Sequence, residues 1–260
     1  MINYINDIAK IDKFDRYSAI INILNENKIS YKVEKLPHHQ SLGNIIVEFN
    51  PSVLKKIVLS AHYDNIFGTP GANDNASACA ILLNLIITHK NTTEHLEFVF
   101  FDLEESGFVG SKYYVKKNKN KIYYAINLDM CGQGESIVLT KNWHSDTQFK
   151  ELCKKYNAEI VKKIPLTDTD SFLNENIKAI CIISSTNRDV EWYKNYDTMN
   201  YFSIIPDFLA TLHKSTDTVD KINFKQVNNI YLFVNELLAQ LLFSLELYNE
   251  FQSLINEIDS

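Results

Sequence analysis

The sequence is short of the features that mark several classes of protein. Its 260 residues include only seven glycines, five prolines and four cysteines. So little glycine and proline excludes collagen-like chains and low-complexity disordered ones. The cysteines are widely spaced and form no CxxC pair, so the chain has neither a zinc-ribbon pattern nor the disulfide framework of a small secreted domain. We expect Cys79, Cys131, Cys153 and Cys181 to be buried, reduced thiols.

Basic residues and long apolar runs are also scarce. The chain has 26 Lys and Arg against 32 Asp and Glu, a formal net charge of −6, so the basic face of a nucleic-acid-binding protein is not expected. The N-terminal stretch scatters charges among its apolar residues, unlike a signal peptide. The most apolar stretch, residues 231–248, is interrupted by polar side chains and is expected to form a core helix. We therefore expect a cytoplasmic protein with no nucleic-acid or membrane partner.

Short β-rich segments alternate with helical patterns along the chain. Apolar residues at three- and four-residue spacing predict a helix or helix pair over residues 5–24. Strands are predicted at 29–36, 44–49, 56–62, 96–102, 121–129, 136–140 and 178–184, and further helices at 75–90, 108–118, 145–156 and 223–250. Several strands are apolar at successive positions, as in a sheet covered on both faces. This alternation predicts an α/β fold, a three-layer α/β/α sandwich with a mixed, mostly parallel central sheet. No repeat or linker divides it, so one domain over residues 1–260 is expected.

Chemically capable side chains follow the ends of three predicted strands, where open α/β sheets place their active sites. His62 and Asp64 close the strand at 56–62, and because they are two apart their side chains point the same way. Asp64 is thus placed to accept the second ring N–H of a metal-bound His62. Glu104 and Glu105 follow the next strand, so one carboxylate can coordinate a metal while its neighbour acts as a general base. Asp129 ends a third strand.

Two further segments add a carboxylate and an imidazole. Asp74 lies in the turn GANDNAS at 71–77, which leads into an apolar helix and places its carboxylate to bridge two cations. His213 precedes the long C-terminal helix, with Asp217 nearby as a candidate partner for its ring.

Taken in order, these segments resemble the motifs of the M28 family of metallopeptidases, the co-catalytic zinc aminopeptidases. The matching elements are the HxD at 62–64, GANDNAS at 71–77, EESGFVGS at 104–111, NLDM at 127–130 and HKSTDT at 213–218. The resemblance spans residues 56–221 and implies the fold of the zinc-dependent exopeptidases.

The resemblance also implies roles for individual residues. Two zinc ions would share Asp74, one held also by His62 and Asp129, the other by Glu105 and His213. Glu104 would be the base that deprotonates the water between the metals and passes the proton to the leaving amine, with Asp64 supporting the catalytic site. Met130 would line the pocket for the first side chain of a peptide with a free N-terminus. The Asp74–Asn75 peptide bond would be cis.

One departure and four alternatives accompany this interpretation. Thr169 stands where the family's S-D-H-x-x-F element has histidine, which bears on substrate contacts. A glutaminyl cyclase with one zinc shares the fold, but Asn75 and the EExGxxGS pattern favour a peptidase. A carboxypeptidase would need a cation such as Arg188 to hold the substrate carboxylate. An inactive binding module and a two-metal phosphoesterase complete the alternatives. The aromatic-rich segment 185–212 is interpreted as a pocket wall or lid, or as surface packing.

Overall fold

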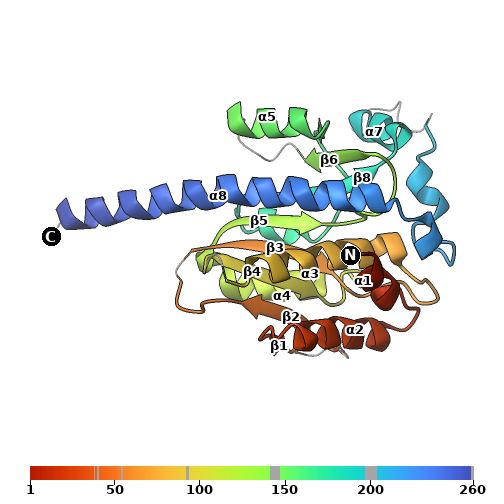
Figure 1. Cartoon of the computed structure of the whole chain (residues 1–260), viewed down its shortest axis with the longest axis horizontal. Coiled ribbons are helices and arrows are strands. Elements are labelled where there is room, and N and C mark those ends of the chain that lie inside the picture. Colours follow the sequence, from red (N-terminus) through yellow and green to blue (C-terminus); the bar gives the residue numbers. More distant parts are fainter. Residues whose placement is uncertain are drawn as a thin grey trace.

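The chain folds around one eight-stranded sheet, shown in Figure 1. The computed structural model describes residues 1–260 except 38, 40, 54, 92–93, 141–146, 197–203 and 259–260, and omits the side chains of 147–148 and 251–258. The strands are β1 Lys32–Glu34, β2 Asn44–Glu48, β3 Lys56–His62, β4 Leu96–Phe101, β5 Ile122–Leu128, β6 Ser136–Thr140, β7 Glu159–Val161 and β8 Ala179–Ser185. All seven predicted strands are present, and β7 was not predicted.

The sheet is mixed and mostly parallel, as the sequence predicts. Its order is β1-β2-β4-β3-β5-β8-β6-β7. The pairings β4/β3, β3/β5, β5/β8 and β6/β7 are parallel, whereas β1/β2, β2/β4 and β8/β6 are antiparallel. β3 and β4 are buried at every position, which is why their sequences are apolar without alternation. The carboxyl ends of the three parallel strands β4, β3 and β5 therefore lie side by side at one end of the sheet.

Helices cover both faces of the sheet. They are α1 Ile2–Ile8, α2 Lys13–Glu26, α3 Ala78–His89, α4 Val109–Asn118, α5 Thr147–Lys155, α6 Thr169–Leu173, α7 Asn187–Lys194 and α8 Phe224–Ile258. One core cluster joins α1, α2, α3, α5 and α8 to the first face. Two smaller clusters join α4 and α6, and separately α7, to the second face. The predicted three-layer sandwich is confirmed.

α8 runs along the strands over the first face and continues beyond their ends (Figure 1). Its inward side chains from Val227 to Leu245 belong to the main core, which confirms the predicted core helix. Phe243, Leu247 and Tyr248 on the same helix are largely exposed. Among the described residues, Phe224–Glu250 is the one helical stretch whose length and composition would let it cross a membrane, and 39% of its most apolar window is buried inside the protein.

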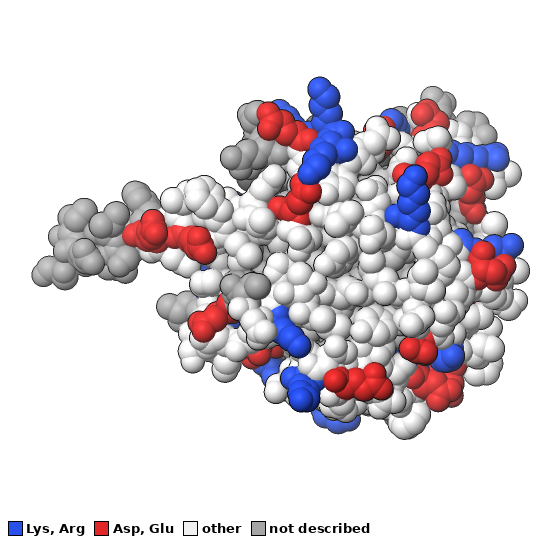
Figure 2. All heavy atoms as spheres, in the orientation of Figure 1, with Lys and Arg blue, Asp and Glu red and all other residues white. Residues whose placement is uncertain are grey.

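Two further properties bear on the predictions. All four cysteines are free and buried, as expected. On the face seen in Figure 2, acidic and basic side chains are interspersed and form no large basic patch.

Candidate metal centre

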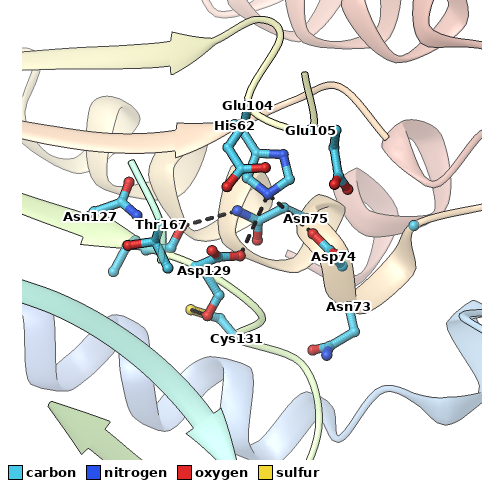
Figure 3. A network of polar contacts seen from close by, with 12 residues as sticks. His62, Asn73, Asp74, Asn75, Glu104, Glu105, Asn127, Asp129, Cys131 and Thr167 are labelled. Atoms are coloured by element: carbon cyan, nitrogen blue, oxygen red, sulfur yellow. Dashed lines mark hydrogen bonds and ion pairs between the residues drawn. The ribbon is translucent and has the colours of Figure 1, made fainter. Parts of the chain in front are cut away.

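The five predicted ligands converge at the carboxyl end of the parallel trio. Figure 3 shows four of them, His62, Asp74, Glu105 and Asp129. His62 is the last residue of β3, and Asp129 directly follows β5. Glu105 lies in the loop after β4, Asp74 in the turn before α3, and His213 in the segment before α8. Glu104, the predicted base, is buried beside them. The motifs that are scattered over 150 residues of sequence thus form one cluster.

The donor atoms form two triads that share Asp74. In the first, Nε2 of His62 lies 3.1 Å from Oδ1 of Asp74 and 3.5 Å from Oδ1 of Asp129. In the second, Nε2 of His213 lies 3.1 Å from Oε2 of Glu105 and 3.5 Å from Oδ2 of Asp74. Within each triad the ligand atoms all lie within 4.8 Å of one another. The two oxygens of Asp74 therefore face different triads.

Asp64 links the end of β3 to the loop after β4. Nδ1 of His62 lies 3.2 Å from the backbone oxygen of Asp64 and 3.6 Å from its carboxylate, so the ring is oriented with Nε2 toward the cluster. The Asp64 carboxylate also accepts hydrogen bonds from the backbone N–H groups of Glu104, at 3.0 Å, and Glu105, at 3.2 Å. One buried carboxylate thereby positions a ligand and both glutamates.

Asp74 is held by backbone contacts around an irregular turn. The Asp74–Asn75 peptide bond is cis, as the resemblance implies. Asn75 donates from its amide to the backbone oxygen of Leu128, which ties the turn to the end of β5. The carboxylate of Asp217 accepts from the backbone N–H groups of Asn73 and Asp74, at 2.8 and 3.0 Å. The expectation that Asp217 partners His213 is therefore wrong, because the two Asp217 oxygens instead accept from the backbone N–H groups of Asn73 and Asp74.

The cluster holds more negative charge than its own side chains can offset. Burial, reinforced by the nearby carboxylates, raises the pKa of Glu104 to about 10. Burial also raises the pKa of Asp129. Burial alone would lower the pKa of His62, but the surrounding carboxylates raise it well above its usual value. Such shifts are typical of carboxylates gathered where a cation belongs.

The residues fit a pair of divalent cations. Oδ1 of Asp129 is buried and has no hydrogen-bond partner among the described residues, although it points toward His62. Imidazole nitrogens and carboxylate oxygens without a thiolate are a donor set that suits zinc and also accommodates cobalt or manganese.

A cavity of about 290 Å³ opens directly onto the cluster. The predicted pocket residue Met130 lines it, together with Tyr193 and Phe208 from the aromatic-rich segment. That part of the segment is therefore a pocket wall, and Tyr201 and Phe202 lie outside the described residues. The remaining apolar lining comes from Phe108, Ile164, Pro165, Leu166, Ile183 and Leu212.

No lysine or arginine is found among the described residues that line this cavity. Arg188, the cation that a carboxypeptidase would need, lies 3.9 Å from the carboxylate of Asp207 and is largely exposed. The cavity can accept an apolar side chain, and among the described residues its lining includes no lysine or arginine that could hold a substrate carboxylate.

Comparison with known proteins places this site in a family. The model of peptidase family M28 matches residues 44–238, three quarters of the chain. The chain belongs to peptidase family M28. Aminopeptidase YwaD of Bacillus subtilis is 33% identical over 103 residues, which are 36% of this chain and 23% of that protein. The match to these curated relatives spans between 23% and 43% of their own length.

Solved structures of related fold include zinc aminopeptidases and glutaminyl cyclases. The zinc aminopeptidase BSAP from Bacillus subtilis superimposes with a TM-score of 0.59 at 21% identity, covering 74% of this chain and 48% of that one. The glutaminyl cyclase of Porphyromonas gingivalis superimposes with a TM-score of 0.70 at 16% identity, covering 92% of this chain and 96% of that one. At these identities the likeness establishes the M28 fold.

Asp168 is a site residue to which the sequence assigned no role. It stands at the aspartate of the family's S-D-H-x-x-F element, is completely buried, and has no hydrogen-bond partner for either carboxylate oxygen among the described residues. Burial raises its pKa to about 7. Its place in that element was the available signal, but burial beside Glu104 is visible only in the folded chain.

Proposed function

We propose that this M28 protein is an aminopeptidase that holds two zinc ions and removes N-terminal residues from peptides. The observation that carries the proposal is the pair of triads joined by the carboxylate of Asp74, with Glu104 beside them. Five donors divided in this way supply three ligands to each of two cations, and leave open positions for a substrate. When bound, two such ions polarise the scissile carbonyl and lower the pKa of an attacking water.

Glu104 is proposed as the proton carrier. Its raised pKa means that it holds a proton at neutral pH while the cluster lacks cations. Positive charge within the cluster lowers that pKa and frees the carboxylate to act as a base. In its ionised form Glu104 would accept a proton from the attacking water and then donate it to the leaving amine. Glu104 lines the cavity in which a substrate would lie, so it is placed to make both transfers.

The cavity supports a preference for apolar N-terminal residues. Its wall of aliphatic and aromatic side chains is close to the cluster and has room for a side chain such as that of leucine or methionine. The neighbouring carboxylates favour the positively charged end of a peptide and disfavour its carboxylate end.

An aminoacyl-amide assay tests this proposal. The purified protein should hydrolyse leucine and methionine fluorogenic amides, lose that activity with a chelator, and regain it with zinc. Acetylation of the substrate's N-terminus should abolish hydrolysis. Equal hydrolysis of free and acetylated substrates would contradict the aminopeptidase assignment.

The same preparation also tests the cyclase alternative. A glutaminyl cyclase would convert a peptide that begins with glutamine to pyroglutamate without cleaving a peptide bond, and with one zinc per chain. We expect two zinc ions per chain and no cyclisation. One ion together with cyclisation would replace the proposed function.

A further inference from the structure

Arg16 is a buried arginine close to the metal centre that neither the motifs nor the family match includes. It lies on α2, upstream of the matched residues 44–238, and its side chain is completely buried. Arginine is seldom buried without partners, because removing its charge from water is costly. Its contacts therefore indicate what it does.

The guanidinium joins the two ends of the loop between His62 and Asp74. Nε donates to the backbone oxygen of Tyr63 at 2.6 Å. Nη1 donates to the backbone oxygens of Pro70 and Gly71, at 2.8 and 3.2 Å. Tyr63 directly follows His62, and Gly71 lies three residues before Asp74. One planar group thus fixes the distance between the chain segments that carry a ligand of the first triad and the shared carboxylate.

The loop packs tightly against this guanidinium at Gly71. Gly71 adopts a φ of 59°, in the left-handed region that favours glycine. A Cβ at this position would lie 2.5 Å from the backbone oxygen of Asp74 and 2.8 Å from Nη1 of Arg16. A methyl group here would have to displace either the Asp74 turn or the arginine.

The charge of Arg16 also faces the acidic cluster. Asp74, Asp64 and Asp217 each attract the guanidinium electrostatically. The guanidinium donates its hydrogen bonds to the three backbone carbonyls and not to these carboxylates. It therefore holds the backbone and, through its charge, also offsets part of the negative charge of the cluster.

We propose that Arg16 is a positioning residue that sets the spacing of His62 and Asp74 and thereby the zinc affinity of the site. This inference rests on the proposed function, because it presumes that the site binds zinc. It assigns to α2, outside the family match, a part in building the metal centre.

Zinc competition against a chromogenic chelator tests the inference on folded protein. Arg16→Met should weaken zinc binding by about 10- to 100-fold, the range found when groups that orient metal ligands are removed. Arg16→Lys keeps the charge but cannot reach three carbonyls, so a smaller loss of about threefold to tenfold is expected. Gly71→Ala should weaken binding from the other side of the same contact. With saturating zinc, kcat should fall in these variants while KM changes little.

Leu24→Ala is the matched control. Leu24 is buried on the same helix, two turns beyond Arg16. Its truncation should lower the melting temperature and leave the zinc affinity of the folded protein within about twofold of wild type. This separates loss of α2 packing from loss of the arginine contacts.

Each outcome decides the inference. Wild-type zinc affinity in Arg16→Met would overturn it. If Arg16→Met does not fold, wild-type affinity in both Arg16→Lys and Gly71→Ala would overturn it. If the wild-type protein binds no zinc, the proposed function is overturned and this inference with it. If the wild type binds zinc and the variants bind it with the same affinity, this inference alone is overturned.

Discussion

Two clusters of carboxylates lie at opposite ends of the central strands, and they differ in whether a lysine ammonium lies among them. At the amino end of β3 and β4, Lys56 pairs with Glu48 and, at 3.0 Å, with Glu97. Tyr114 donates a further hydrogen bond to Glu97. Glu48 also pairs with Lys32, at 2.8 Å. The two carboxylates of this cluster thus face two ammonium groups, one of them the buried Lys56, and are neutralised within the chain.

The cluster at the carboxyl end lacks such a resident ammonium. Its carboxylates face two histidines and each other, and Oδ1 of Asp129 is left without a hydrogen-bond partner among the described residues. The nearest buried cation, Arg16, is engaged by backbone carbonyls. The comparison teaches that burial of carboxylates alone does not mark a metal site. The mark is burial of more negative charge than the chain neutralises.

Exchange of one glutamate for glutamine in each cluster should separate them most strongly. Glu104→Gln removes the proposed base and should lower kcat by about three orders of magnitude while zinc content stays the same. Glu97→Gln, in the other cluster, should leave kcat of the folded enzyme within about twofold. Steady-state kinetics with metal analysis checks both, and a Glu104→Gln enzyme of normal kcat would refute the role of Glu104.

Removal of the resident ammonium should show the structural role of the amino-end cluster. Lys56→Met leaves Glu97 buried without a cation and should lower the free energy of unfolding by about 3 to 5 kcal/mol. Zinc affinity should not change, because Lys56 lies at the opposite end of β3 from His62. Urea unfolding measures the first effect. A loss of zinc binding that accompanied it would contradict the independence of the clusters.

Metal removal should act on the carboxyl-end cluster alone. Each zinc ion at 100 times its Kd should stabilise the folded protein by about 2.7 kcal/mol, and a chelator should remove the contribution of both ions. Thermal melts of the wild type and of Lys56→Met should show the same zinc-dependent shift. A melting temperature that is the same with and without the chelator would contradict a metal centre.

A smaller effect is expected from pH in the metal-free protein. The folded-state pKa of Asp168, about 7, exceeds its ordinary value of 3.8, so the folded protein binds this proton more tightly than the unfolded chain does. The stability it contributes is complete below pH 3.8 and is lost as the pH rises through 7. Asp168→Asn has no such proton to lose. From pH 5 to pH 7 the free energy of unfolding of the wild type should therefore fall by about 2 kcal/mol relative to that of the variant, at no more than about 1.36 kcal/mol per pH unit. Denaturant unfolding of both proteins at pH 5 and pH 7 measures this change. If their free energies of unfolding differed by the same amount at the two pH values, the raised pKa of Asp168 would be contradicted.

The sequence predicted the parts of the fold whose pattern is long or fully apolar. β3 and β4 were visible because burial on both faces leaves no polar residue in the strand. β7 has only three residues at the edge of the sheet, too few to show a period. α7 was also missed, although Thr186 and Asp189 form a capping box that its sequence could have indicated.

The site residues that could be predicted are those whose side chains belong to sequence motifs in a fixed order along the chain. His62, Asp74, Glu105, Asp129 and His213 stand in the order of the family motifs, and the fold brings them together. Arg16 could not be found this way, because its partners are backbone carbonyls 47 to 55 residues away that carry no residue-specific signal. The place of Asp217 was missed for the same reason, since it binds backbone N–H groups.

Zinc stoichiometry tests the central claim most directly. Metal-free protein should be titrated with zinc in a calorimeter, and the bound metal counted by elemental analysis after desalting. We expect two zinc ions per chain in the wild type and one in His213→Ala, which loses a ligand of the second triad only. One ion or none in the wild type would contradict it.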